Sequence, residues 1–115
     1  MRFGVPSVSV DDLDGQPPGT VLLDVREDEE WVAGHAAEAI HVPLSELPAG
    51  LLDSGVLDRP GRIVVVCRVG ARSAQVTAWL ARQGHDAVNL AGGMEAWAEA
   101  GRPIVGPAGT AGVII

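Results

Sequence analysis

The chain has 115 residues, 15 acidic against 8 basic side chains, a formal net charge of -7 and a single cysteine, Cys67. This length predicts one domain, one cysteine excludes a disulfide framework, and one thiol with three scattered histidines disfavours a metal site. The excess of acidic residues argues against binding nucleic acid. No apolar run approaches the ~20 residues that cross a bilayer, and the first six residues lack the apolar stretch of a signal peptide. We therefore expect a cytoplasmic protein.

The first third of the chain predicts two short strands and a helix. Gly4–Val10 reads as a short extended segment, and Gln16–Gly19 as a loop because of its proline and glycine content. Val21–Arg26 is an apolar run that ends in charge, which predicts a buried strand. The acidic run Glu27–Glu30 favours the first turn of a helix, where the helix dipole stabilises negative charge, and Gly34 should end that helix.

The middle of the chain contains the most apolar segment. Ala39–Val42 predicts a short strand, and Ser45 is expected to cap a helix that runs to about Leu52. Arg62–Cys67 is continuously apolar and β-branched up to its cysteine, which is typical of a central parallel strand covered on both faces. Ser73–Gln83 has apolar side chains at helical spacing and predicts a helix.

The last elements complete an alternating pattern. Ala87–Leu90 predicts another strand, and Gly92–Gly93 should open a final helix that ends at Gly101. Strands that alternate with helices across short connections predict an α/β domain with a parallel sheet. We expect this domain to span residues 1–105, and the glycine-rich segment 106–115 to be a mobile tail or to dock late.

The loop after the most apolar strand carries the chemistry that the sequence predicts. Cys67 lies at the carboxyl end of that strand, the edge of a parallel sheet where ligands bind. Arg68–Ser73 then leads into a helix, whose N-terminus and backbone N–H groups attract anions. Gly70 lets the loop curl into a cradle. This field should lower the pKa of the thiol below ~8.5, so Cys67 is predicted to be an activated nucleophile; the alternative is a small buried hydrophobe.

Four segments, in this order, resemble the motifs of single-domain rhodanese-like sulfurtransferases. The resemblance covers roughly residues 5–105 and implies a rhodanese-like α/β fold: a central, mostly parallel five-stranded sheet with helices on both faces. The segments are Val21–Glu27 with Glu30–Trp31, Gly34–His35 with Ala39–Leu44, the loop Cys67–Ser73, and Leu90–Pro103 with its Gly92–Gly93 pair.

The resemblance also implies a two-step reaction that needs no cofactor. The thiolate of Cys67 attacks the outer sulfur of an anionic donor such as thiosulfate, sulfite leaves, and the persulfide then gives its sulfur to cyanide or a thiol. The substrate-binding residues would be Arg68, Val69, Gly70, Ala71, Arg72 and Ser73. Because Val69 and Ala71 are apolar, anion recognition would rest on backbone N–H groups and the two arginines, with Arg68 at the mouth and Arg72 bracing the loop against an acidic residue.

Four further residues have two interpretations each. Asp24 or Glu30 would support the site by orienting a loop arginine, and Arg26 would lie at the same sheet edge as Cys67. The alternative for these three is a structural ion pair. His35 would be a proton donor near the site, or a histidine that only packs its loop.

Three rival functions remain open at this point. A phosphatase or arsenate reductase would also use a cysteine and an arginine, but only four residues separate Cys67 from Arg72, where phosphatase-type relatives have five. A non-catalytic docking module is the second rival, although the cysteine and its neighbours are present. The third is a sulfur carrier whose donor and acceptor are proteins of a sulfur relay.

Overall fold

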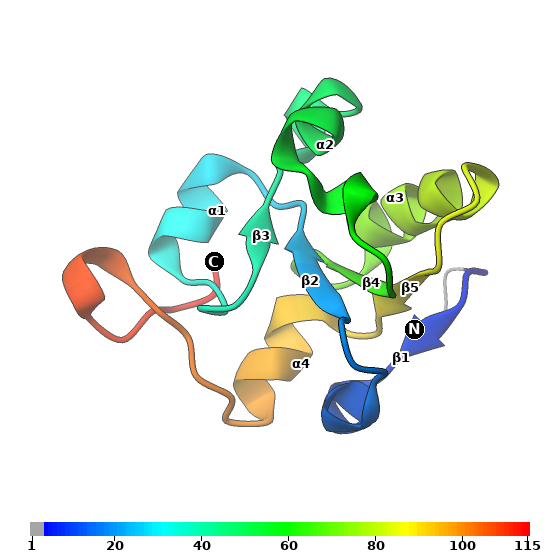
Figure 1. The fold of residues 1–115 in the computed structure, drawn as a ribbon. Helices are drawn as coiled ribbons and strands as arrows, with labels where there is room; N and C mark the ends of the chain where they lie inside the picture. The colour runs from blue at the N-terminus through cyan, green and yellow to red at the C-terminus, as the bar shows by residue number, and fades with distance from the viewer. Residues whose placement is uncertain (1–3) are drawn as a thin grey trace.

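The computed structural model describes residues 4–115 and has five strands that form one sheet (Figure 1). The order across the sheet is β1-β5-β4-β2-β3, and every pairing is parallel. This confirms the predicted α/β fold with a five-stranded sheet. Residues 1–3, at the start of the expected domain, lie outside the described range. The strands are β1 Ser7–Val8, β2 Val21–Asp24, β3 Ile40–His41, β4 Ile63–Val66 and β5 Ala87–Leu90.

The helices alternate with the strands, as the pattern predicted. They are α1 Asp28–Ala33, α2 Ala49–Ser54, α3 Ala71–Arg82 and α4 Gly93–Glu99, with short 3-10 turns at 10–15, 44–46, 56–58 and 107–109. Helix α3 begins two residues earlier than expected. Gly70 allows this because it adopts φ +116°, a backbone conformation that side chains disfavour, and so turns the chain directly into the helix.

The helix expected from Ser45 to Leu52 is wrong in its first half. Residues Leu44–Glu46 form a 3-10 turn instead, and α2 starts only after Pro48. Proline disfavours the helical conformation of the residue that precedes it, and Leu47 is extended (φ -84°, ψ 147°), so no helix runs from Ser45 through Pro48. The Ser45 hydroxyl donates to the Glu27 carboxylate instead of capping a helix, and Leu52 is 68% exposed.

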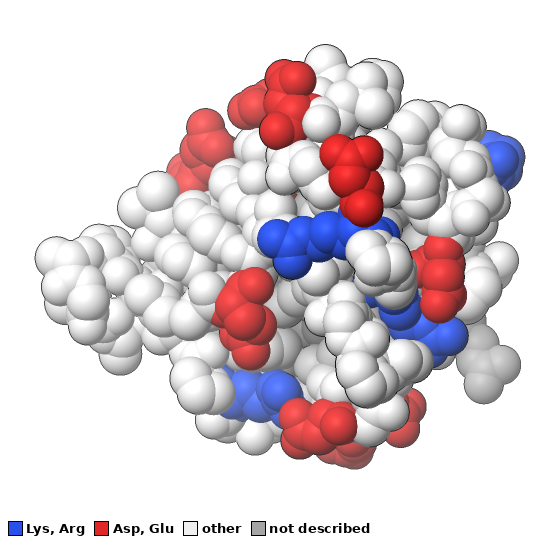
Figure 2. Space-filling view, in the orientation of Figure 1, with Lys and Arg blue, Asp and Glu red and all other residues white. Residues whose placement is uncertain are grey.

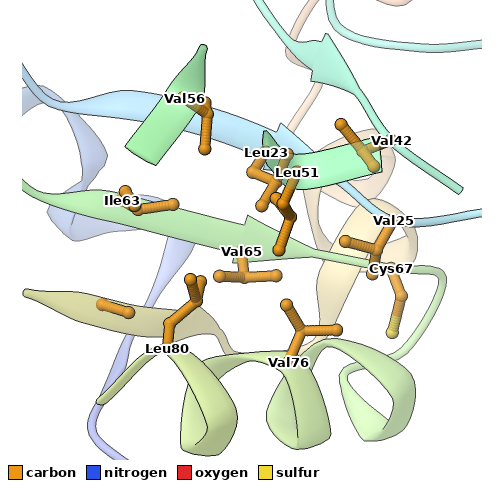
Figure 3. Packing of buried hydrophobic residues seen from close by; sticks show 11 residues of the cluster. Leu23, Val25, Val42, Leu51, Val56, Ile63, Val65, Cys67, Val76 and Leu80 are labelled. Carbon is orange, nitrogen blue, oxygen red and sulfur yellow. The ribbon is translucent and has the colours of Figure 1, made fainter. Parts of the chain in front are cut away.

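Two apolar layers enclose the sheet because successive side chains of a strand point to opposite faces. On β4, Val65 packs against Val76 and Leu80 of α3 (Figure 3), whereas its neighbour Val66 belongs to the opposite layer with Trp97 of α4. Strand β4 is buried on both faces, which explains its unbroken apolar sequence. Helices therefore cover both faces, as predicted.

The segment 106–115 makes specific contacts with the rest of the chain. The Val113 N–H donates to the Ala33 carbonyl at 2.9 Å, and the Gly112 N–H donates to the Ile104 carbonyl at 3.1 Å. Ile114 packs against the apolar layer that contains α4. A Cβ on Gly112 would lie 2.8 Å from the Gly34 Cα, so the backbone of the tail approaches the end of α1 closely. These are the contacts of a docked tail.

Charged side chains of both signs are interspersed on the face drawn in Figure 2. Several form surface pairs, such as Arg62 with Asp86 at 3.2 Å and Arg102 with Asp14 at 3.3 Å. Exposed pairs of this kind add at most about 1 kcal/mol each to stability. Within residues 4–115, no helix is both long enough and apolar enough to cross a membrane.

Candidate active site

The sulfur of Cys67 lies in a cradle made by the loop that follows β4. Figure 3 shows the Cys67 side chain at the end of the strand with its sulfur directed towards the start of α3. The Gly70 N–H lies 3.1 Å from Sγ, the Ser73 N–H 3.4 Å and the Ser73 hydroxyl 3.2 Å. Only 1% of the residue is exposed. Several donors thus converge on one buried sulfur atom, an arrangement that suits an anion.

Burial and hydrogen bonding act in opposite directions on the Cys67 thiol. Burial alone would raise its pKa, because the thiolate loses hydration. Hydrogen bonds from the Ser73 hydroxyl and from the N–H groups of Ser73, Gly70 and Val69 favour the thiolate form, and their combined effect lowers the pKa of Cys67 below its usual value. A low pKa makes a cysteine both more ionised and more reactive at neutral pH.

The first turn of α4 holds the opposite side of the loop. The Met94 N–H donates to the Cys67 carbonyl at 2.9 Å, and the Glu95 N–H donates to the Arg68 carbonyl at 3.0 Å. A Cβ on Gly93 would stand 2.4 Å from the Cys67 carbonyl oxygen, and its φ of +58° also favours glycine. Gly93 is therefore needed for α4 to approach the loop closely enough to bind the Cys67 and Arg68 carbonyls.

Arg72 closes the loop and pairs with an acidic side chain of α1. Its two terminal nitrogens lie 2.7 Å and 2.8 Å from the two carboxylate oxygens of Glu30. The Glu30 carboxylate also accepts a hydrogen bond from the Glu27 N–H at 3.0 Å. The hydrogen bond from Arg72 lowers the pKa of Glu30, and the same bond raises the pKa of Arg72. Glu30 is thus the acidic side chain against which Arg72 is held.

The remaining loop residues differ in exposure. The Arg68 side chain is 51% exposed and its Nε lies 2.9 Å from Glu95 Oε2. Val69 is also exposed and contributes a backbone N–H to the cradle. Ala71 begins α3. The loop thus presents the cation of Arg68 and two apolar side chains, Val69 and Ala71, to solvent beside a buried sulfur.

Asp24 and Arg26 form a fully buried ion pair, at 2.8 Å between Arg26 Nη2 and Asp24 Oδ2. The same Arg26 nitrogen donates to the Gly34 carbonyl at 2.7 Å. Among residues 4–115, no hydrogen bond joins either side chain to the loop 67–73. This geometry fits a structural ion pair, because the pair connects the end of β2 to the turn that follows α1.

His35 also contacts its own loop and not the cradle. Its Nδ1 lies 2.7 Å from the Trp31 carbonyl oxygen, and its ring stacks on the Trp31 indole at a centroid distance of 3.7 Å. His41 stacks on Trp31 as well, at 4.5 Å. Within the part of the chain that the structure describes, His35 has no hydrogen bond to the cysteine loop. Its contacts are those of a histidine that packs its loop.

Asn89 on β5 is a site residue that sequence reasoning missed. Its side chain is buried and bonds to two residues of the loop: Nδ2 donates to the Gly70 carbonyl at 3.1 Å, and Oδ1 lies 2.5 Å from the Ser73 hydroxyl. The available signal was an amide within the otherwise apolar run Ala87–Leu90, because a buried polar group needs partners.

Comparison with known proteins identifies one family and three similar proteins. Residues 9–100 match the family model described as the rhodanese-like domain. A sulfurtransferase of Allochromatium vinosum is 38% identical over 90 residues, which are 77% of this chain and 81% of that protein. A rhodanese-related protein of Thermoplasma volcanium has a TM-score of 0.77 at 34% identity, covering 87% of this chain and 97% of that one. The thiosulfate sulfurtransferase of Pseudomonas aeruginosa has a TM-score of 0.73 at 26% identity, covering 96% of this chain and 22% of that one.

Proposed function

This chain belongs to the rhodanese-like domain family, and on that premise we propose that it is a sulfurtransferase with Cys67 as its nucleophile. The observation that carries the proposal is the convergence of the Gly70 N–H, the Ser73 N–H and the Ser73 hydroxyl on one buried sulfur. The two N–H donors are fixed by the backbone, so they stabilise charge that develops on the sulfur during a reaction without having to reorganise.

The first step transfers a sulfur atom from a small anionic donor, for which thiosulfate is the proposed example. The Cys67 thiolate attacks the outer sulfur of thiosulfate, a sulfur–sulfur bond forms, and the bond to the departing sulfite breaks. The two charges of the donor leave with sulfite, and the enzyme keeps a persulfide with one negative charge. Arg68 is the exposed cation beside the loop and would attract the donor and the leaving sulfite.

The second step gives the sulfur to an acceptor such as cyanide or a thiolate. The acceptor attacks the outer sulfur of the persulfide, and the electron pair of the broken sulfur–sulfur bond returns to Cys67 as thiolate. Since the chain contains no second cysteine, no internal thiol can resolve the persulfide. The sulfur must therefore leave on another molecule, either a small acceptor or a protein of a sulfur relay.

The short loop favours sulfur over phosphate. Four residues separate Cys67 from Arg72, and Arg72 is engaged through two hydrogen bonds by Glu30. A phosphatase needs its arginine free to bind two oxygens of a phosphate. The lowered pKa of Cys67 supports a catalytic role over a docking role, because docking requires no reactive thiolate.

Mass spectrometry of the intact protein tests the proposed function. After thiosulfate is added and removed, we expect the mass to rise by one sulfur atom on Cys67. Cyanide should then restore the original mass and release thiocyanate. An unchanged mass after thiosulfate would contradict thiosulfate as donor; if a persulfide donor also leaves the mass unchanged, the sulfurtransferase assignment is wrong.

Two arginine variants separate attraction of the donor from support of the loop. Arg68→Ala should raise KM for thiosulfate about threefold to tenfold and leave kcat nearly unchanged. An exposed charge acts mainly on the rate at which the donor and the enzyme associate. Arg72→Ala should lower kcat/KM about 100-fold, because it leaves Glu30 unpaired and lets the loop shift. Steady-state kinetics with Arg62→Ala, a half-buried arginine paired with Asp86 and outside the loop 67–73, provide the control. Equally small effects of Arg68→Ala and Arg72→Ala would contradict these roles.

A further inference from the structure

The Ser73 hydroxyl faces two acceptors but has a single proton. Its oxygen lies 2.5 Å from Asn89 Oδ1 and 3.2 Å from Cys67 Sγ. A hydroxyl donates one hydrogen bond at a time. The amide oxygen and the sulfur therefore compete for the same proton.

The orientation of the Asn89 amide follows from its other partner. The Gly70 carbonyl can only accept, and it lies 3.1 Å from the Asn89 nitrogen. The NH₂ group must face that carbonyl, so the amide oxygen faces Ser73. Two oxygens at 2.5 Å require a proton between them, and the amide oxygen has none. The Ser73 hydroxyl must therefore donate to Asn89 in this arrangement, and it presents a lone pair to the sulfur.

We propose that Asn89 is a positioning residue that decides when the Ser73 hydroxyl donates to Cys67. While the sulfur is uncharged, the hydroxyl donates to Asn89 Oδ1, and the thiol S–H can donate to the Ser73 oxygen. When the sulfur becomes a thiolate, the O–H bond of Ser73 turns from Asn89 to the sulfur. The proton stays on Ser73 throughout, and only the direction of its bond changes.

This device matches the reaction and rests on the proposed function. In the persulfide, Cys67 Sγ is a bridging atom without charge, so the hydroxyl returns to Asn89. When the acceptor breaks the sulfur–sulfur bond, Sγ leaves as thiolate and the hydroxyl turns to it. The Ser73 hydroxyl thus donates to the leaving sulfur while its charge develops. A hydrogen bond that forms or strengthens at this stage stabilises the transition state and accelerates the reaction.

The charged groups near the sulfur are paired elsewhere. From α3, Arg72 acts on Cys67 through its charge and is hydrogen-bonded to Glu30 of α1. From α4, Glu95 pairs with Arg68. Among residues 4–115, no hydrogen bond connects any of these four side chains to Asn89 or Ser73. Variants at position 89 therefore change the competition for the proton without removing a counter-charge of the sulfur.

The test compares the effect of Ser73→Ala on the Cys67 pKa in three backgrounds: wild type, Asn89→Leu and Asn89→Asp. The pKa is read from the rate of iodoacetamide alkylation against pH, which reports one site because Cys67 is the only thiol. The proposal expects the pKa increase caused by Ser73→Ala to be about one pH unit in Asn89→Leu, where no acceptor competes. It expects a smaller increase in wild type and almost none in Asn89→Asp, where a carboxylate retains the proton.

Each background is compared with itself, so the charge of the aspartate variant cancels. Thr77→Val is the matched control, because Thr77 is a buried residue of α3 whose hydroxyl donates its proton to the Ser73 carbonyl at 2.8 Å; in that background the increase should equal the wild-type value. The Asn89→Asp series alone decides the question if Asn89→Leu does not fold. Equal increases in all backgrounds, or the reverse order, would overturn the proposal. Since alkylation needs no sulfur donor, this outcome is independent of whether the persulfide forms.

Discussion

Replacement of Cys67 by alanine is expected to abolish sulfur transfer and persulfide formation completely. The cysteine is the only thiol of the chain, so no neighbouring group can take over the attack on the donor. The loop would keep its backbone donors, but these stabilise an anion that no longer forms. The release of thiocyanate from thiosulfate and cyanide should fall to the rate measured without enzyme.

The matched control for this variant is Cys67→Ser, which retains a small acceptor for the N–H groups of Gly70 and Ser73. It should fold like the wild type, as judged by circular dichroism and thermal unfolding, and be equally inactive, because a serine hydroxyl remains protonated near neutral pH. Sulfur transfer by either variant above the uncatalysed rate would show that Cys67 is not the nucleophile. If neither variant folds, the mass increase on Cys67 of the wild-type protein after thiosulfate treatment tests the assignment instead.

Substitution of Asp24 by asparagine is expected to destabilise the protein by about 3–5 kcal/mol, because it leaves the Arg26 cation buried without a counter-charge. Both side chains are fully buried, and Arg26 is also bonded to the Gly34 carbonyl, so the guanidinium cannot move into solvent without breaking further contacts. The free energy of unfolding of a small domain is about 5–15 kcal/mol in total, so this variant should lose a large share of its stability.

Urea unfolding followed by circular dichroism measures this loss. The control is Asp86→Asn, which removes the acid of the exposed pair with Arg62 and should cost less than about 1 kcal/mol. If Asp24→Asn costs no more than Asp86→Asn, the buried pair is not a structural support of β2. A strong loss of activity with unchanged stability would instead place Asp24 in the catalytic machinery.

These two expected results separate chemistry from architecture at the same edge of the sheet. Cys67 follows β4, and Asp24 ends the neighbouring strand β2, which pairs with it in parallel. Both lie at carboxyl ends of strands, and the sequence predicted that Asp24 or Glu30 would orient a loop arginine there. The structure shows that the acid which pairs with a loop arginine is Glu30 and that Asp24 pairs with Arg26.

The sequence alone determined the elements and the position of the nucleophile. The apolar run of β4, the glycine at position 70 and the glycine pair that precedes α4 follow local rules of burial and backbone conformation, which neighbouring residues decide. The same rules located the thiol at a strand-to-helix turn. The starts of two helices differ from the prediction: α3 begins at Ala71 because Gly70 turns the chain, and α2 begins after Pro48 because proline keeps the residue before it extended.

Only the tertiary structure decided which side chains meet. The sheet order β1-β5-β4-β2-β3 places β5 beside β4, so Asn89, which lies 22 residues after Cys67 in the chain, reaches the Gly70 carbonyl and the Ser73 hydroxyl. The choice of Glu30 over Asp24 as partner of Arg72 likewise depends on how α1 lies against the loop. Such contacts join residues far apart in the chain, and no spacing or propensity specifies a distance in space until the strands have paired.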